Sequence, residues 1–192
     1  LVDGTANPAG TMNGIGWSSD LQLYAVSAFI TSGSVRALFT STDGITWTQR
    51  TTLGSTYNHI IWVRELGLFV GAGQIADPAA QYCTSPDGIT WTGRAITTGT
   101  ASEQGDLCYS PQLGLLVSVG LSVSRLVTSP DAITWTEQTV PTTSALYSVA
   151  WSAQLGIFCA VGTYVSSSNA MTSPDGVTWT ARRCIDGTFA AA

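Results

Sequence analysis

The stretch TSPDGVTWT, residues 172–180, decides the fold, because nearly the same nine letters occur three times earlier in the chain. The earlier copies are TSTDGITWT at 40–48, TSPDGITWT at 84–92 and TSPDAITWT at 128–136. The aspartates at the centre of the copies are spaced 44 residues apart throughout. A period of this length indicates a repeat architecture in which each copy is one structural unit.

A second element precedes each copy and consists of an aromatic residue, a turn and an apolar run. Its versions are GWSSDLQLYAVSA (16–28), IWVRELGLFVGAG (61–73), CYSPQLGLLVSVG (108–120) and AWSAQLGIFCAVG (150–162). The aromatic residue lies near the end of a half-buried strand, the apolar run is typical of a strand covered on both faces, and two more strands flank the aspartate turn. Four antiparallel strands per repeat predict an all-β protein, a β-propeller of four blades. The alternative is an incomplete propeller that is completed by other chains or missing segments.

The repeat also sets the expected domain limits. The propeller should span residues 13–192, with blades at about 13–57, 58–104, 105–146 and 147–192. Residues 1–12 are too short for a blade, and we expect them to supply a closing strand that pairs with the last strand and removes an exposed edge. The chain begins without an initiator Met, as a processed or excised piece of a longer protein would.

The letters PDG inside the repeat have a mechanical explanation. Pro presets φ for a type I turn, Asp accepts backbone N–H groups, and Gly takes the left-handed position that follows. A catalytic or metal-binding aspartate would need His, Glu or another Asp nearby, and no copy contains one. Ala132 replaces the Gly in the third copy, and a left-handed Ala costs about 1–2 kcal/mol. That hairpin should therefore be either strained or slightly reshaped.

The pattern S-x-D-G-x-T-W resembles the Asp-box, or BNR, repeat of sialidases, sortilin-type receptors and several propeller lectins. The resemblance covers about 165 of the 192 residues through four matched repeats. It implies a propeller in which each box is a peripheral hairpin between the third and fourth strands of a blade, away from the ligand site. Degenerate TSPDGxTWT arrays also resemble those of phage or bacterial surface proteins. The structural box residues that the resemblance implies are Asp43, Trp47, Asp87, Trp91, Asp131, Trp135, Asp175 and Trp179.

The composition argues against several classes of partner. The chain has no Lys, seven Arg and twelve acidic residues, with a net charge of −5, so it lacks the basic surface that nucleic acids or anionic membranes attract. No apolar stretch is long enough for membrane insertion. The four cysteines have no CxxC spacing, so a zinc site is poorly supported and we interpret them as small buried residues, with a disulfide left open. We expect no metal and no cofactor.

The sequence gives little support for an enzyme. His59 is the one histidine, and no nucleophile elbow occurs. Glycosidases generally use two carboxylates that flank one cleft, and no copy of the repeat holds such a pair. The resemblance to sialidases implies an arginine triad, a Tyr–Glu pair and six blades, but no motif frames any arginine and the chain has material for four blades. We therefore expect a protein that is not an enzyme.

Binding is favoured by the variable loops. In a four-stranded meander, the loops between strands two and three share one face with the segments between blades, and these differ among the copies. Asn, Asp, His, Arg and Tyr side chains there could bind a sugar, although every propeller has a solvated rim of this kind. The inner ends of these segments are expected to line the mouth of the propeller's central channel, and Ser148 is expected to lie there too. The candidate ligand-binding residues are Asn13, Arg36, Tyr57, Asn58, His59, Gln81, Asp106, Arg125, Tyr147, Tyr164 and Asn169.

The expected function is thus non-enzymatic recognition or attachment. The ligand would be a glycan or a surface receptor, and the protein would act outside the cell or on a virion surface, where other virion or surface subunits are further expected partners. The chief alternative is a purely structural decoration or fibre domain of a phage-like assembly. A sialidase-like glycosidase is the weakest of the three hypotheses.

Overall fold

The computed structural model is an all-β protein. It describes residues 10–31, 34–74, 77–96, 103–121, 125–141, 145–165 and 168–182, apart from the side chains of Thr51, Tyr164, Val165 and Ser168. These residues form four antiparallel sheets of four strands each, and every sheet has its strands in chain order. Each sheet corresponds to one copy of the sequence repeat, so the prediction of four four-stranded units is confirmed. We call the sheets blades one to four.

The strands are short, as their β-branched and aromatic content predicts. Blade one contains β1 (Gly10–Ser18), β2 (Leu23–Ile30), β3 (Val35–Ser41) and β4 (Thr48–Thr52). Blade two contains β5 (Tyr57–Val63), β6 (Leu68–Gly73), β7 (Tyr82–Ser85) and β8 (Thr92–Arg94), with a short 3-10 helix, η1 (Pro78–Ala80), before β7. Blade three contains β9 (Gln104–Ser110), β10 (Leu115–Gly120), β11 (Leu126–Ser129) and β12 (Thr136–Gln138). Blade four contains β13 (Leu146–Ser152), β14 (Ile157–Val165), β15 (Ser168–Ser173) and β16 (Thr180–Arg182).

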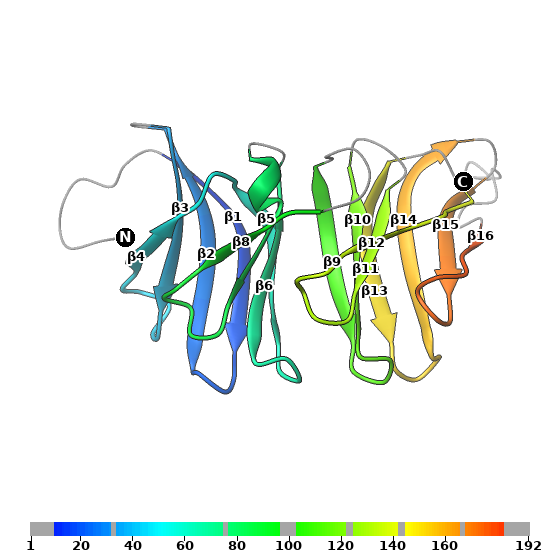
Figure 1. Ribbon diagram of the computed structural model, residues 1–192, viewed down its shortest axis with the longest axis horizontal. Coiled ribbons are helices and arrows are strands. Elements are labelled where there is room, and N and C mark those ends of the chain that lie inside the picture. The colour runs from blue at the N-terminus through cyan, green and yellow to red at the C-terminus, as the bar shows by residue number, and fades with distance from the viewer. Residues whose placement is uncertain are drawn as a thin grey trace, which may run out of the picture.

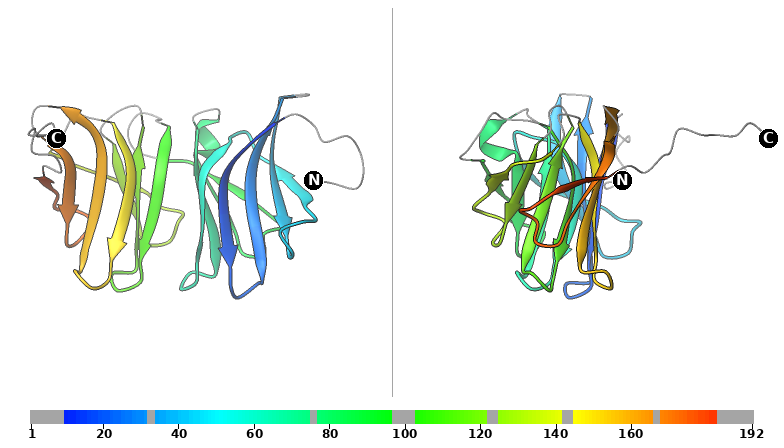
Figure 2. Two further views of the ribbon diagram at one scale, coloured as in Figure 1. Left: turned by 180° about the vertical axis from the view of Figure 1, so that it is seen from behind. Right: turned by 90° about the vertical axis from the view of Figure 1, so that its right-hand side faces the viewer.

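The blades lie in an open row (Figures 1 and 2). The inner strand β5 packs beside both β1 and β9, and β9 packs beside β13. Blade one forms one end of the molecule and blade four the other. Over the described residues the row does not close into a ring, which corresponds to the alternative of an incomplete propeller.

The structure corrects the expected limits in two places. Residues 10–12 do not form a separate closing strand, because Gly10 to Met12 lie in β1 and pair with Ala28 to Ile30 of the same blade. Residues 1–9, the rest of the predicted closing strand, and residues 183–192 of the fourth predicted blade lie outside the described residues. The three predicted limits between blades each come one residue too late, because the inner strands β5, β9 and β13 begin at Tyr57, Gln104 and Leu146.

The hydrophobic core lies between consecutive blades. One cluster joins blades one and two through Leu38, Ile60 and Phe69, and another joins blades two and three around Tyr82 and Trp135, whose rings stack 3.8 Å apart. A third cluster joins blades three and four. Because these contacts join residues of different repeats, each blade depends on its neighbour for stability.

The aspartate turns, residues 41–46, 85–90, 129–134 and 173–178, share one geometry. In blade one, Asp43 Oδ1 accepts hydrogen bonds from the backbone N–H groups of Ile45 (2.8 Å) and Thr46 (2.7 Å), and from the Ser41 hydroxyl (2.9 Å). The other three aspartates accept the corresponding three bonds. Ala132 has φ 61° and lies in the same left-handed region as Gly88, which has φ 71°. The third turn is therefore strained and keeps its shape.

Two further findings concern the cysteines and the helices. Cys83 is buried and Cys108 is half-buried, and both are free thiols; Cys159 is half-buried, and Cys184 lies outside the described residues. In the part of the chain that the structure describes, no helix is long and apolar enough to cross a membrane.

Candidate functional site: a polar cluster across three blades

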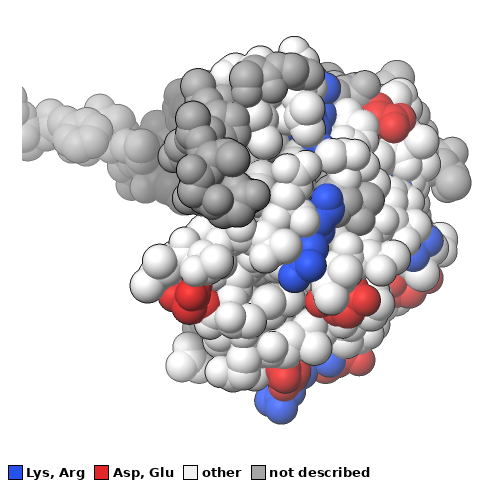
Figure 3. Space-filling model, turned by 90° about the vertical axis from the view of Figure 1, so that its left-hand side faces the viewer, with Lys and Arg blue, Asp and Glu red and all other residues white. Residues whose placement is uncertain are grey.

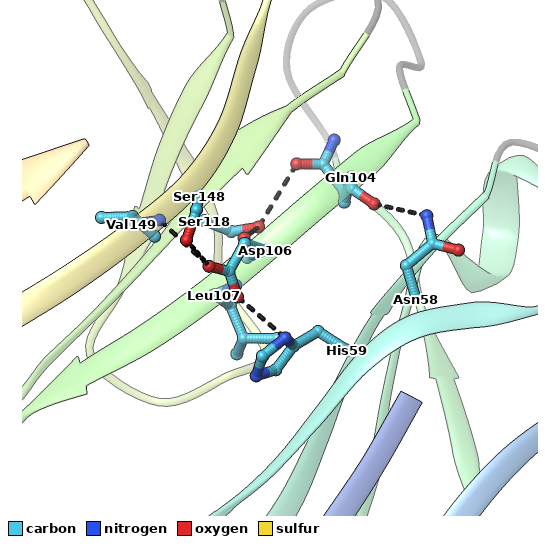
Figure 4. A network of polar contacts seen from close by, with 8 residues as sticks. All are labelled: Asn58, His59, Gln104, Asp106, Leu107, Ser118, Ser148 and Val149. Carbon is cyan, nitrogen blue, oxygen red and sulfur yellow. Dashed lines mark hydrogen bonds and ion pairs between the residues drawn. The ribbon is translucent and has the colours of Figure 1, made fainter. Parts of the chain in front are cut away.

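Polar side chains from three consecutive blades meet near the beginnings of the inner strands (Figure 4). Asn58 and His59 lie at the start of β5, Asp106 near the start of β9, and Ser148 near the start of β13. The inner strands begin at the end of each blade opposite the aspartate turns, because each blade is a four-stranded meander. We call the set of Asn58, His59, Gln104, Asp106, Ser118 and Ser148 the polar cluster.

Asp106 is the centre of the polar cluster. Its Oδ1 accepts hydrogen bonds from His59 Nδ1 (2.8 Å) and from the backbone N–H of Leu107 (2.8 Å). Its Oδ2 accepts from the Ser148 hydroxyl (2.6 Å) and from the backbone N–H of Val149 (3.0 Å). Blades two, three and four are thereby joined through one carboxylate.

The surroundings of Asp106 favour its charged form. Burial acts to raise the pKa of this carboxyl, but the hydrogen bonds from His59, Ser148 and Val149 outweigh burial and hold its pKa below the ordinary value. All four lone-pair positions of the carboxylate accept a bond. This carboxylate is therefore a structural acceptor, poorly suited to act as a nucleophile or as a general acid.

His59 is the exposed member of the pair. Its side chain is 40% exposed, whereas that of Asp106 is 12% exposed. Since Nδ1 is directed at the carboxylate, the neutral imidazole offers Nε2 as a hydrogen-bond acceptor on the accessible side of the ring. The Ser148 hydroxyl donates to Asp106, not to His59, so the three residues do not form a nucleophilic triad.

A second layer of hydrogen bonds holds the cluster. Asn58 Nδ2 donates to the backbone carbonyl of Gln104 (2.9 Å) and contacts Glu103 Oε1 at 3.4 Å. The buried Gln104 Oε1 accepts from the Tyr82 hydroxyl (3.0 Å), and the Ser118 hydroxyl donates to the backbone carbonyl of Asp106 (2.9 Å). These bonds fix the backbone from which Asn58 and Asp106 project.

The structure places three of the predicted rim residues in the interior. Tyr57 is fully buried, its hydroxyl donates to the carbonyl of Ala80 (3.1 Å), and burial raises the pKa of the phenol. Gln81 is buried beside β7, and Arg125 is buried with an ion pair to Glu137 at 3.4 Å. The prediction that they surround an open channel is therefore wrong, because their side chains pack inside the blades.

The remaining predicted residues lie apart from the polar cluster or beside it. Asn13 lines a pocket of about 260 Å³ on blade one with Met12, Gly14, Ile15, Val26 and Trp47. Arg36 lies over the ring of Phe29, with its guanidinium carbon 5.3 Å from the ring centroid. Tyr147 is exposed and its hydroxyl accepts a bond from Thr163 Oγ1 (3.0 Å), while Asn169 is half-buried on β15. The side chain of Tyr164 lies outside the described residues.

Sequence reasoning found Asn58, His59, Asp106 and Ser148 but missed Gln104 and Ser118. Gln104 aligns with the apolar Leu146 of blade four, so its position resembled a core position. Ser118 lies within an apolar run, where only its polarity among Leu and Val residues was a signal. Both side chains form hydrogen bonds inside the protein, with partners that only the folded structure brings close.

Comparisons with known proteins identify the fold alone. No protein-family model and no curated protein matches the chain. Among solved structures, it is similar to a nidogen/laminin complex (TM-score 0.67, 12% identity), to streptogramin B lyase (0.67, 12%), and to the extracellular domain of BT4673 from B. thetaiotaomicron (0.68, 11%). These matches cover 92%, 93% and 100% of this chain.

The three similar structures are β-propeller proteins. The chain spans 66%, 56% and 24% of the respective matched chains, so it corresponds to part of each. At such low identity the likeness extends to the β-propeller fold and not to activity.

Proposed function

We propose that this chain is a non-enzymatic recognition module, an Asp-box propeller that binds a glycan or a glycan-bearing surface receptor through the polar cluster. One observation carries the proposal: side chains from three blades converge on Asp106, which holds the exposed imidazole of His59 in a fixed orientation. A side chain fixed in this way recognises a ligand with little loss of conformational entropy.

The chemistry of the cluster suits a neutral, hydroxyl-rich ligand. The Nε2 of neutral His59 accepts a hydrogen bond from a sugar hydroxyl, and Asn58, whose amide nitrogen bonds Gln104 and Glu103, offers its side-chain oxygen as a second acceptor. The Asp106 carboxylate is already engaged with four donors, so the site presents planar polar groups more than free charge. Planar polar groups of this kind fix ligand orientation in small-molecule sites.

Two observations support attachment over catalysis. The saturated carboxylate and the direction of the Ser148 hydroxyl leave the cluster without an activated nucleophile or a second catalytic carboxylate. The resemblance of the repeats to phage and bacterial surface proteins favours a place on a virion or cell surface. A purely structural role as a decoration or fibre domain is the second candidate, and the open ends of the row of blades favour it.

A glycan screen followed by titration tests the proposal. We expect wild-type protein to bind at least one glycan, and His59→Ala to weaken that binding by about tenfold or more, since one directed hydrogen bond to the ligand is lost. The matched control is Glu65→Ala, which removes an exposed polar side chain in the β5–β6 hairpin, at the other end of β5 from His59. Absence of glycan binding by the wild type, or equal affinity of the His59 variant, would overturn the proposal.

A further inference from the structure

Consecutive blades pack through two unlike faces. We call the side of a sheet that faces the previous blade its leading face, and the opposite side its following face. Ile60, Leu107 and Val149 each lie two residues before the aromatic residue of an inner strand. They are on the leading faces of blades two, three and four, and each is at most 4% exposed. Ile15 occupies this position in blade one and is 58% exposed.

The aspartate turns follow the same rule. Residues Gly88, Ala132 and Gly176 are buried, and a Cβ atom added to Gly88 would lie 2.6 Å from Leu23 of the preceding blade. The corresponding Gly44 of blade one is exposed. Trp47 is half-buried, whereas its three counterparts in the later blades are buried. In blade one, Ile15, Gly44 and Trp47 on the leading face are thus more exposed than their counterparts, and no described residue of another blade packs on them.

Blade four shows the complementary defect. Ala72 and Val119 occupy equivalent positions in the second strands of blades two and three. Both are fully buried on following faces, against the next blade. Val161 has the same position in blade four and is 39% exposed. Leu155, in the first hairpin of this blade, is 72% exposed. The following face of blade four therefore has an exposed apolar part at Val161 and Leu155 that no described residue of another blade covers.

We propose that these two faces bind each other in two copies of this chain, so that blade four of one copy packs on blade one of the next. The interface continues a contact that the molecule already makes three times, with Val161 and Ile15 in the places that Val119 and Val149 take in the cluster between blades three and four. Figure 3 shows acidic and basic groups scattered over the end of the molecule that blade one forms, with uncharged surface between them. Because the faces are unlike, the association is head-to-tail.

The test is the mass of the intact chain in solution, measured by light scattering and sedimentation over a range of concentrations. Wild-type protein should rise above the 20.0 kDa of one chain. Ile15→Arg damages only the leading face and Val161→Arg only the following face, so each variant alone should associate at least about tenfold more weakly. An equimolar mixture retains one intact pair of faces and should form a dimer that grows no further.

The control and a second pair of variants keep the test decisive. Ile89→Arg places the same charge at a half-exposed position on an internal blade and should associate as the wild type does. If either first variant fails to fold, Met12→Arg (45% exposed) and Leu155→Arg (72% exposed) change the same two faces at other exposed positions. A wild-type monomer at all concentrations, or a mixture of variants that stays monomeric, would overturn the proposal.

Discussion

At the scale of single residues, four aspartates hold four identical turns. Each accepts two backbone N–H groups and a serine hydroxyl, and these bonds lower its pKa; hydrogen bonding to the backbone holds the pKa of Asp43 and Asp175 to about 2. The four bonding patterns agree so closely that the aspartates need no ligand to account for them. This agreement favours a mechanical role.

The lowered pKa values predict a loss of stability in acid. The carboxylates have a lower pKa in the folded chain than the 3.8 of the free group, so the stability they provide is complete above about pH 5. It should decline as the pH falls from about 4 towards 2. Urea unfolding at pH 7, 4 and 3 measures this decline, which should be smaller in Asp175→Asn. An unfolding free energy that is constant down to pH 3 would contradict the assignment.

The glycines of the aspartate turns give a second prediction. Gly44→Ala and Gly88→Ala both force Ala to φ 71°, which costs about 1–2 kcal/mol, but only the latter also pushes a methyl group against Leu23. Gly88→Ala should therefore reduce the unfolding free energy more, by about 1–3 kcal/mol beyond Gly44→Ala. Chemical denaturation compares the two variants. Equal losses would show that the second turn does not press on blade one.

At the scale of elements, Asp106 fastens three inner strands together. The strands β5, β9 and β13 come from different repeats and share no backbone ladder. The carboxylate bridges them through His59 and through the Ser148–Val149 segment. The same residue that orients the candidate ligand contact therefore also contributes to cohesion between blades.

We expect Asp106→Ala to lower the unfolding free energy by about 2–4 kcal/mol, because the buried N–H of Val149 loses its acceptor. Arg64→Ala is the control, since the exposed Arg64 pairs with Asp20 (3.1 Å), such surface pairs contribute about 1 kcal/mol or less, and the change keeps the bond from Trp62 Nε1 to Asp20. Thermal and urea unfolding compare the two. Equal effects would mean that the carboxylate does not join the blades.

The elements themselves could be predicted from the sequence, whereas the partners of polar residues could not. The repeat fixes four strands per copy, and the limits between blades were predicted to within one residue because the aromatic residues and the turns recur. The pairing of His59 with Asp106 joins two repeats and depends on how neighbouring blades are offset. Burial of Tyr57 and Arg125 likewise depends on packing that no local pattern encodes.

At the scale of the whole molecule, the row of blades is open (Figure 1). The number of blades follows from the count of repeats, but the angle between them is set by side-chain volumes across each interface, so closure could not be read from the repeat. The open row leaves Ile15 and Val161 exposed at opposite ends, while the polar cluster lies within blades two to four. Association and ligand binding therefore use different residues and can be disrupted separately.

The central claim is that ligand binds at the polar cluster and not at the aspartate turns. His59 is the one histidine of the chain, so its imidazole gives a unique NMR signal that a glycan titration can follow beside the indole signals of Trp91 and Trp179, which donate to Gly88 and Gly176 of the aspartate turns. We predict that the bound glycan shifts the His59 signals and leaves both indoles unchanged. Shifts confined to the indoles, with His59 unaffected, would contradict the claim.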